Sequence, residues 1–574
     1  MSPFGLSFWV MAWSLRVTPL TLLCCAAIEV VVALLPAMQA IAFGSLVDCL
    51  NRECAGSDLI GNLAATAGIV GLAQALSSVG ASVRMILNSD LEYGAKRELA
   101  RAAAWRTAGD VQDPGSGRRL QEAKNAIPLL AMMPQSVMTV AGAVITAVSL
   151  CLAIWHYNWG AALFVVLALF PSIVAFMKVS KIARPVWSVV GEDERIAEYH
   201  FDQLRYEATG VELAMLGTST RVAEHAGLRW ESVGDVLRRL RLRSVGVELP
   251  AGVVTALCLL LALAMLTVSG SGSAGASVGV LAIVSGIAST SNAGNAAGRV
   301  LAANTRVAGY RLFTEEQREP KTQRIVRDIG SVEVRDLEVT YPGATKPALD
   351  RVSVKVEAGE MIGIVGANGA GKTTLVSAIC GLVQAQSGSV LIDGVDQAVR
   401  SETERFAMIG TLSQEFGRFQ LSVRDSVLLG TPEQDVPDTR IWEALEFVGI
   451  ADLVREMSGG LDAQLGVQWG GRGLSGGQWQ RLALARIVVR DAGIWILDEP
   501  TSAIDAEAEE EIFSLLTRSK KERITCVVSH RAWTLKQVDR IYVLHEGRLV
   551  QEGHYDDLVT SPGRFKELFR QQFA

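Results

Sequence analysis

A glycine-rich segment that ends in a lysine and two threonines has the spacing of a phosphate-binding loop. Residues 366–374 read GANGAGKTT and follow an apolar run, 361–365, that is expected to be a strand. Glycines let several backbone N–H groups point at phosphate oxygens, and the helix that follows presents its positive end. Lysine adds a mobile cation and threonine a hydroxyl ligand for Mg²⁺. The residues predicted to hold the phosphates are Gly366, Asn368, Gly369, Gly371, Lys372, Thr373 and Thr374.

Two consecutive acids, Asp498 and Glu499, end a second apolar run at residues 494–497. A nucleotide-hydrolysing sheet needs a carboxylate in the Mg²⁺ shell at such a strand end, and Asp498 is predicted to supply it. Glu499 is predicted to polarise the attacking water. An acidic pair after a strand is also a common solvated strand end, but its occurrence together with a phosphate loop favours the catalytic interpretation.

Residues 474–478 read LSGGQ and resemble the signature of ATP-binding cassette (ABC) proteins. The signature lies shortly before the acidic pair, which strengthens the resemblance. It implies that these residues open a helix whose positive end faces the γ-phosphate of an ATP held by another subunit. The signature residues expected to contact that nucleotide are Ser475, Gly476, Gly477 and Gln478.

The same resemblance implies roles for four further residues. Tyr341 matches the aromatic residue that stacks on adenine, and Gln414 matches the glutamine that reaches Mg²⁺ and the water. Asp505 matches a residue that contacts the opposite site of a dimer, and His530 matches the switch histidine that contacts the γ-phosphate. Each has an ordinary alternative, namely a strand tyrosine, a surface glutamine, a helix-capping aspartate and a coincidental histidine.

One segment departs from the pattern of many multidrug exporters. Residues 468–473 read QWGGRG and lack the glutamate that those exporters have just before the signature. This segment is more similar to the bacterial peptide exporters. The departure weakens the expectation of an ionic contact between this loop and the membrane domain.

The elements that position these residues lie in the second half of the chain, whereas the first half is apolar. The chain has 574 residues, 49% of them hydrophobic and 20% charged, with a net charge of −6, which excludes a disordered or collagen-like chain. Residues 125–177 and 249–298 contain no Lys, Arg, Asp or Glu. About 20 apolar residues cross a bilayer as a helix. We therefore predict six spans, at residues 19–47, 59–83, 136–155, 159–179, 249–268 and 275–298.

The basic residues predict the orientation of these spans. Residues 84–135 hold eight Lys and Arg and residues 178–248 hold eleven, whereas the opposite loops hold only Arg52. Basic segments stay on the cytoplasmic side. We therefore expect a multi-pass protein of the cell membrane with both termini in the cytoplasm.

These patterns divide the chain into a transmembrane domain at 1–311, a linker at 312–330 and a nucleotide-binding domain at 331–574. The predicted fold is an α-helical membrane domain of six transmembrane helices, followed by an α/β P-loop NTPase cassette with a helical subdomain. Turns near 110–120 and near 198–213, before the E-x-x-x-x-G-like segment 212–217, are expected to couple the two domains. The alternative is that each turn is part of a long amphipathic helix.

Two features of the membrane half have less specific interpretations. The amino-terminal residues 1–13 are expected to form an amphipathic helix in the membrane interface, or else a frayed tail. Cys49 and Cys54 lie in the one outward loop of appreciable length, either bridged or as two free thiols. The expected anchors of the amino-terminal helix are Phe4, Phe8, Trp9 and Trp13.

Glu29 is the only acid well within an apolar span. An intramembrane carboxylate usually faces a cavity or a partner. Glu29 is therefore expected either to line a translocation pathway for a cationic or polar peptide-like cargo, or to make a structural hydrogen bond to a neighbouring helix. Further polar residues near the end of the sixth span are also expected to line the cavity, namely Asn292, Asn295 and Arg299.

Six spans followed by one cassette resemble an ABC exporter half-transporter of the bacterial peptide or multidrug type. This resemblance implies ATP-driven export of a small molecule or peptide, with ATP and Mg²⁺ as cofactors. Each ATP lies between two cassettes in this family, so a dimer with a second half-transporter is expected in the lipid bilayer, a homodimer in preference to a heterodimer.

Two alternatives to export remain. One is a nucleotide-sensing regulatory membrane protein, and the other is siderophore-type import through an exporter fold. Six spans exclude a soluble DNA-repair or translation ABC protein, so no nucleic-acid partner is expected. No leader-cleaving peptidase domain is expected ahead of the first span, so a peptide cargo is expected to arrive already processed or to be trimmed by another protein.

Overall fold

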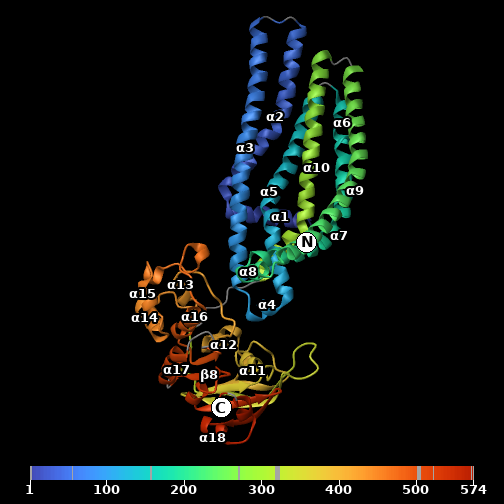
Figure 1. Ribbon diagram of the computed structural model, residues 1–574. Helices are drawn as coiled ribbons and strands as arrows, with labels where there is room; N and C mark the ends of the chain where they lie inside the picture. Colours follow the sequence, from blue (N-terminus) through green and yellow to red (C-terminus); the bar gives the residue numbers. More distant parts are fainter. Residues whose placement is uncertain are drawn as a thin grey trace. The chain divides into compact units, whose positions relative to one another are not determined.

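A computed structural model describes residues 3–52, 54, 56–155, 158–268, 272–316, 324–500, 506–520, 523–570 and 572. The chain divides into two compact units (Figure 1). Unit 1 comprises Met1–Arg106 and Asp110–Arg318 and is helical, whereas unit 2 comprises Thr107–Gly109 and Glu319–Ala574 and contains all the described strands.

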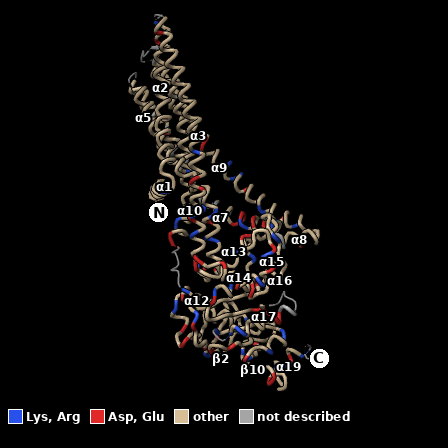
Figure 2. Tube along the Cα trace, turned by 90° about the vertical axis from the view of Figure 1, so that its left-hand side faces the viewer, with Lys and Arg blue, Asp and Glu red and all other residues tan. Residues whose placement is uncertain are grey.

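Unit 1 is built from long helices. Five of the described helices, α2, α3, α5, α9 and α10, are long and apolar enough to cross a membrane. Figure 2 shows long stretches of these helices without charged residues. The described helices before the first strand are α1 (Pro3–Val17), α2 (Pro19–Asn51), α3 (Gly56–Ala104), α4 (Ala108–Gln112, whose first two residues belong to unit 2), α5 (Pro114–Trp155), α6 (Trp159–Leu167), α7 (Leu169–Arg205), α8 (Glu207–Met215), α9 (Ser219–Val268) and α10 (Gly272–Glu316).

The predicted span 159–179 is divided between two helices. Asn158 caps the amino terminus of α6, because its Oδ1 accepts a hydrogen bond from the Ala161 N–H at 3.1 Å. α6 ends at Leu167 and α7 begins at Leu169, so the apolar segment breaks at Ala168.

Helix α1 packs against the other helices of unit 1. Its residues Leu6 and Val10 are fully buried, and the Trp13 indole N–H donates to the Glu98 carboxylate at 2.7 Å. Close to this contact, the Tyr310 hydroxyl of α10 donates to the Ala95 carbonyl of α3 at 3.0 Å. Trp13 therefore fixes α1 to α3 rather than anchoring it in a membrane surface. Of the other predicted anchors, Trp9 lies under the Arg311 guanidinium, Phe8 is 77% exposed, and the Phe4 side chain lies outside the described part of the chain.

The turn between α2 and α3 contains the two cysteines considered above. Both are free thiols in the structure. The Cys54 backbone N–H donates to the Cys49 carbonyl at 3.2 Å, which closes the end of α2.

Unit 2 contains two sheets. The six-stranded sheet has the order β10-β9-β3-β8-β7-β6, in which only β10 is antiparallel to its neighbour. The four-stranded sheet has the order β2-β1-β4-β5 and is antiparallel. The strands are β1 (Ser331–Val339), β2 (Leu349–Glu357), β3 (Met361–Gly366), β4 (Ser387–Ile392), β5 (Val395–Asp396), β6 (Ile409–Leu412), β7 (Ile494–Asp498), β8 (Ile524–Val528), β9 (Arg540–His545) and β10 (Arg548–Gly553).

Hydrophobic residues cover both faces of the parallel strands. Trp495 and Leu497 of β7 point into one core, and Ile494 and Ile496 point into the other. This double burial explains why these strands read as continuous apolar runs in the sequence. The helices of unit 2 are α11 (Lys372–Ile379), α12 (Glu402–Met408), α13 (Val423–Leu428), α14 (Asp438–Phe447), α15 (Ala451–Glu456), α16 (Gly476–Arg490), α17 (Ala506–Ser519), α18 (Tyr555–Thr560) and α19 (Arg564–Leu568).

Arg490 fixes the carboxyl end of α16 to the neighbouring segments. Its guanidinium donates to the carbonyls of Ile409, Gly430 and Phe406, at 2.8, 2.9 and 2.5 Å. These carbonyls belong to β6, to the turn after α13 and to α12. One side chain therefore ties α16 to three separate elements.

We expect Arg490→Met to lower the free energy of unfolding of the cassette by roughly 2–4 kcal/mol, because methionine fills similar space but leaves three carbonyls without this donor. Thermal unfolding of the full chain, followed by tryptophan fluorescence, measures the change. The control is Arg518→Met on the exposed side of α17, which should leave the transition in place. Equal transitions for both variants would contradict the role given to Arg490.

Candidate active site

The candidate site lies where four neighbouring parallel strands end. Strands β3, β8, β7 and β6 adjoin in that order, and their parallel pairing brings their carboxyl ends to one edge of the sheet. Open α/β sheets bind ligands at this edge. The predicted residues follow these strands in turn, with the phosphate loop after β3, His530 after β8, Asp498 and Glu499 at the end of β7, and Gln414 after β6.

The phosphate loop has backbone conformations that favour glycine. Gly369 and Gly371 have φ values of +79° and +102°, in the left-handed region. A Cβ atom on Gly366 would lie 2.5 Å from the Leu544 carbonyl oxygen. Asn368 is exposed at the tip of the turn, and α11 begins at Lys372 directly behind the loop. The loop therefore has the curl and the following helix that a phosphate requires.

The Lys372 ammonium group is drawn across the loop. Its Nζ donates to the carbonyls of Gly366 and Ala367, at 2.8 and 3.1 Å. Burial lowers the pKa of Lys372, while the charges of Asp498 and Glu499 oppose this shift. The lysine is thus near both acids and can move from loop carbonyls to phosphate oxygens.

Tyr341 and Thr374 lie together beside the loop. The Tyr341 hydroxyl is 3.4 Å from the Thr374 Oγ1, and 44% of the tyrosine surface is exposed. Thr374 itself is buried. The exposed tyrosine is therefore available to a planar ligand next to the phosphate loop, as stacking on adenine would require.

Glu499 is held in an unusual backbone conformation. Its φ is +50°, which is rare for a residue other than glycine. Its N–H donates to the Val528 carbonyl at 3.0 Å, and its carboxylate lies 2.9 Å from the Nδ1 of His530. A carboxylate only accepts hydrogen bonds, so Nδ1 carries the proton. This arrangement turns the carboxylate toward His530 at the edge of the sheet.

The oxygen groups near the loop suit a divalent cation. Thr373 offers an exposed hydroxyl, and Asp498 offers a half-buried carboxylate. Burial raises the pKa of Asp498 and Glu499 raises it further, while Lys372 lowers it. Hydroxyl and carboxylate oxygens are the ligands that Mg²⁺ prefers, together with water and phosphate. Gln414 is exposed after β6, where its amide oxygen offers a further ligand of the same kind.

The signature segment forms the amino terminus of α16. Ser475 caps this helix, because its Oγ accepts from the Gln478 N–H at 3.3 Å and the Gln478 Oε1 accepts from the Ser475 N–H at 2.9 Å. Gln478, which was expected to contact the nucleotide, has its side-chain oxygen engaged in this cap. The N–H groups of Gly476 and Gly477 have no such partner within the described residues, so they are the groups left to meet an anion. Asp505 lies outside the described residues.

Gln480 is a residue that the sequence analysis missed. It lies two residues beyond the signature, it is only 2% exposed, and its Nε2 donates to the Glu499 carbonyl at 2.9 Å. Its sequence signal was a glutamine among mostly apolar residues in the first part of a helix. The contact ties the α16 helix to the strained backbone of Glu499.

Comparison with known proteins agrees with this geometry. The sequence model of the family described as ABC transporter matches residues 349–502. A lipid A-core flippase of Burkholderia orbicola (strain AU 1054) is 40% identical over 248 residues, which are 42% of this chain and 40% of that protein. A second lipid A-core flippase, of Polaromonas sp. (strain JS666 / ATCC BAA-500), is 29% identical over 454 residues, 77% of this chain and 75% of that protein.

The fold is similar to that of a bacterial Atm1-family ABC exporter with ATP bound. The TM-score is 0.76 at 21% sequence identity, and the alignment covers 95% of this chain and 97% of that chain. The predicted fold class, a helical membrane domain followed by an α/β cassette, is therefore confirmed.

Residues 349–502 are thus similar to the ABC transporter family, and the fold of the chain, a helical membrane domain followed by one cassette, is that of an exporter half-transporter. The chain spans less than half the length of most of the curated relatives it matches, and the shared part includes this cassette.

We expect Gln480→Ala to lower the kcat of ATP hydrolysis about tenfold while the KM for ATP changes by less than about twofold. The lost hydrogen bond positions the Glu499 backbone and does not touch the phosphate loop. Steady-state ATPase assays of the full chain measure both constants. Gln480→Glu should behave like alanine, because it keeps the shape but removes the N–H donor. Full activity in this variant would contradict the positioning role.

Proposed function

We propose that this chain is one half of an ATP-driven exporter that binds Mg²⁺-ATP and couples its hydrolysis to alternating access of the membrane domain. The observation that carries the proposal is the Glu499–His530 pair at the same sheet edge as a complete phosphate loop. A regulatory cassette has no need of a positioned general base, whereas turnover requires one. The pair therefore favours export over nucleotide sensing.

The proposed roles follow from the chemistry of each group. Lys372 and the glycine N–H groups bind the β- and γ-phosphates, and Thr373, Asp498 and Gln414 hold Mg²⁺, which would neutralise charge on the phosphates. Glu499 polarises the attacking water, and His530 orients Glu499 and contacts the γ-phosphate. The exposed Tyr341 stacks on adenine.

The proposed working unit is a homodimer in the cell membrane with both termini in the cytoplasm. The capped amino terminus of α16 supports the dimer, since the first N–H groups of the helix, those of Gly476 and Gly477, suit a γ-phosphate held by a second cassette. Asp505 would contact the opposite site. The basic residues of the segments 84–135 and 178–248 support the orientation. The cargo class is a peptide or other small molecule.

We expect the purified chain in nanodiscs to run as a dimer and to hydrolyse ATP, and Glu499→Gln to lower the hydrolysis rate at least about 100-fold. Removing a general base typically costs this much. The measurements are the ATPase rate and the oligomeric mass. Glu511→Gln on the exposed side of α17 is the matched control and should keep the wild-type rate. A monomer without hydrolysis would argue against a self-sufficient exporter half.

A further inference from the structure

A polar cavity of about 340 Å³ lies within the helices of unit 1. It brings together side chains from four helices that are far apart in the sequence. Its charged and amide-bearing lining residues are Glu29 of α2, Arg84 of α3, Gln135 of α5, and Asn292, Asn295 and Arg299 of α10. Polar groups inside an apolar helical unit are costly, so such a cluster indicates a site.

The carboxylate of Glu29 is already paired. Its Oε2 lies 3.2 Å from the Nη1 of Arg84, and both side chains are mostly buried. The two glycines beside the pair leave room for it, because a Cβ on Gly80 would lie 3.3 Å from the Arg84 Nη1 and a Cβ on Gly142 would lie 3.3 Å from the Glu29 Oε1. A neutralised Glu29 no longer favours a cationic cargo.

Arg299 gives the cavity an excess of one positive charge. The lining contains two arginines and one glutamate. The Arg299 Nε donates to the Ser136 hydroxyl at 3.2 Å, and no carboxylate of the described residues lies within ion-pair distance of Arg299. Its terminal N–H groups therefore remain available to an anion, and a planar guanidinium fork matches a carboxylate.

The amide side chains add groups that complement a peptide. The Gln135 Oε1 accepts from the Asn88 Nδ2 at 3.1 Å, which leaves the Gln135 Nε2 as a donor. Asn292 and Asn295 lie one turn apart on α10 and each offers a donor and an acceptor. Peptide groups present the same combination of N–H and carbonyl.

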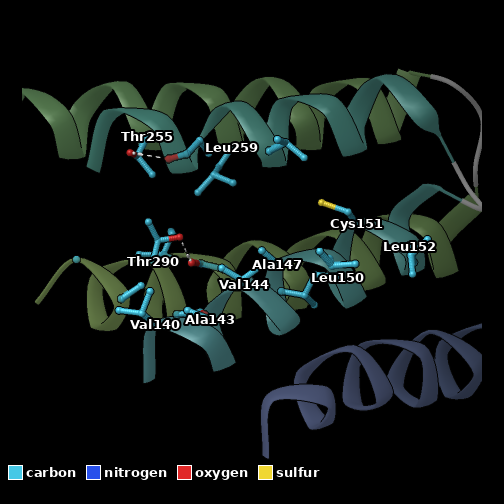
Figure 3. A pocket seen from close by; sticks show the side chains of 18 of the residues that line it. Val140, Ala143, Val144, Ala147, Leu150, Cys151, Leu152, Thr255, Leu259 and Thr290 are labelled. Carbon is cyan, nitrogen blue, oxygen red and sulfur yellow. Dashed lines mark hydrogen bonds between the residues drawn. The ribbon is translucent and has the colours of Figure 1, made fainter. Parts of the chain in front are cut away.

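A second cavity, of about 410 Å³, differs in chemistry and in position. Figure 3 shows it between Leu259 on α9 and Val144 and Ala147 on α5. The hydroxyls of Thr255 and Thr290 at its wall donate to the carbonyls of Ala168 and Gly286, so their protons are not available to a ligand. This cavity suits hydrocarbon.

The two cavities use different faces of α10. The sequence spacing of the polar lining residues, 292, 295 and 299, repeats on one helical face, and that of 286, 290, 293 and 297 repeats on another. A polar ligand therefore has one site of fitting chemistry among these two cavities.

We propose that the polar cavity binds the cargo and selects peptide-like molecules that carry a free carboxylate, which Arg299 receives. This proposal rests on the proposed export function for its role in transport. Binding itself can be measured without hydrolysis, so the two can fail separately.

The probe is a pool of N-acetylated tripeptides of neutral residues, prepared once with free carboxylates and once with terminal amides. The full chain is kept in phosphatidylcholine nanodiscs, and binding is read as the rise of its unfolding temperature with peptide concentration. We expect the acid pool to raise the unfolding temperature at about tenfold lower concentration than the amide pool, because hydrogen bonds to a charged partner are the stronger ones. ATPase stimulation by the same pools is measured separately.

Variants at Arg299 test the assigned contact. Arg299→Gln should remove the preference for the acid pool, and Arg299→Lys should keep most of it. The control is Arg238→Gln on α9, an arginine that does not line the cavity and that should bind like wild type. An unchanged preference in Arg299→Gln would overturn the proposal.

Three further results would also overturn it. These are equal action of both pools, no stabilisation by either pool, and an Arg299-dependent stabilisation seen only when phosphatidylglycerol replaces part of the phosphatidylcholine. The last result would assign the anionic group to a lipid headgroup. If the full chain shows no ATPase activity but still prefers the acid pool, the proposed export function is overturned and the proposed binding site stands.

Discussion

The parallel pairing of β3, β8, β7 and β6 is the constraint on which the nucleotide site depends. Each strand ends in a residue or loop with a chemical role, and only a shared register brings these ends to one edge. A slip of one residue would turn every side chain of a strand to the other face and into the wrong core. The alternating burial of β7, with Trp495 on one side and Ile496 on the other, prevents that slip. Hydrophobic packing thus sets the position of Glu499 relative to the phosphate loop.

The membrane unit solves a different problem, which is how to keep charges within apolar helices. Pairing removes most of the cost of Glu29, and the glycines beside it allow Arg84 to approach. The charged and amide side chains that line the polar cavity then lie on one face of α10, while another face lines the apolar cavity. The spacing of residues along α10 therefore separates a polar cavity from an apolar one.

The sequence predicted the parts whose signal is local. The phosphate loop, the acidic pair and the signature are contiguous motifs, and their flanking strands were recognisable as apolar runs because both faces of the sheet are covered. Contacts between distant residues were not predictable in the same way. Nothing in the sequence indicates that Arg84 faces Glu29, which lies 55 residues away, or that the indole of Trp13 meets Glu98. The break at Ala168 also escaped prediction, since residues 159–179 form a continuous apolar run that carries no charge before Lys178. Gln480 was missed because its partner is a carbonyl, which every residue has.

Helix α16 has a consequence for genetics. In the proposed dimer its amino terminus serves the nucleotide of the neighbouring cassette, whereas Gln480 and Glu499 serve the nucleotide of their own. Lesions in Ser475 and Glu499 then combine differently in a mixed dimer. When one chain carries both lesions, each of the two nucleotide sites contains one lesion and both sites are damaged. When each chain carries one lesion, both lesions fall on the same nucleotide site and the other site stays intact. Two singly defective alleles would therefore leave one working site in the mixed dimer, whereas one doubly defective allele paired with a wild-type allele would leave none.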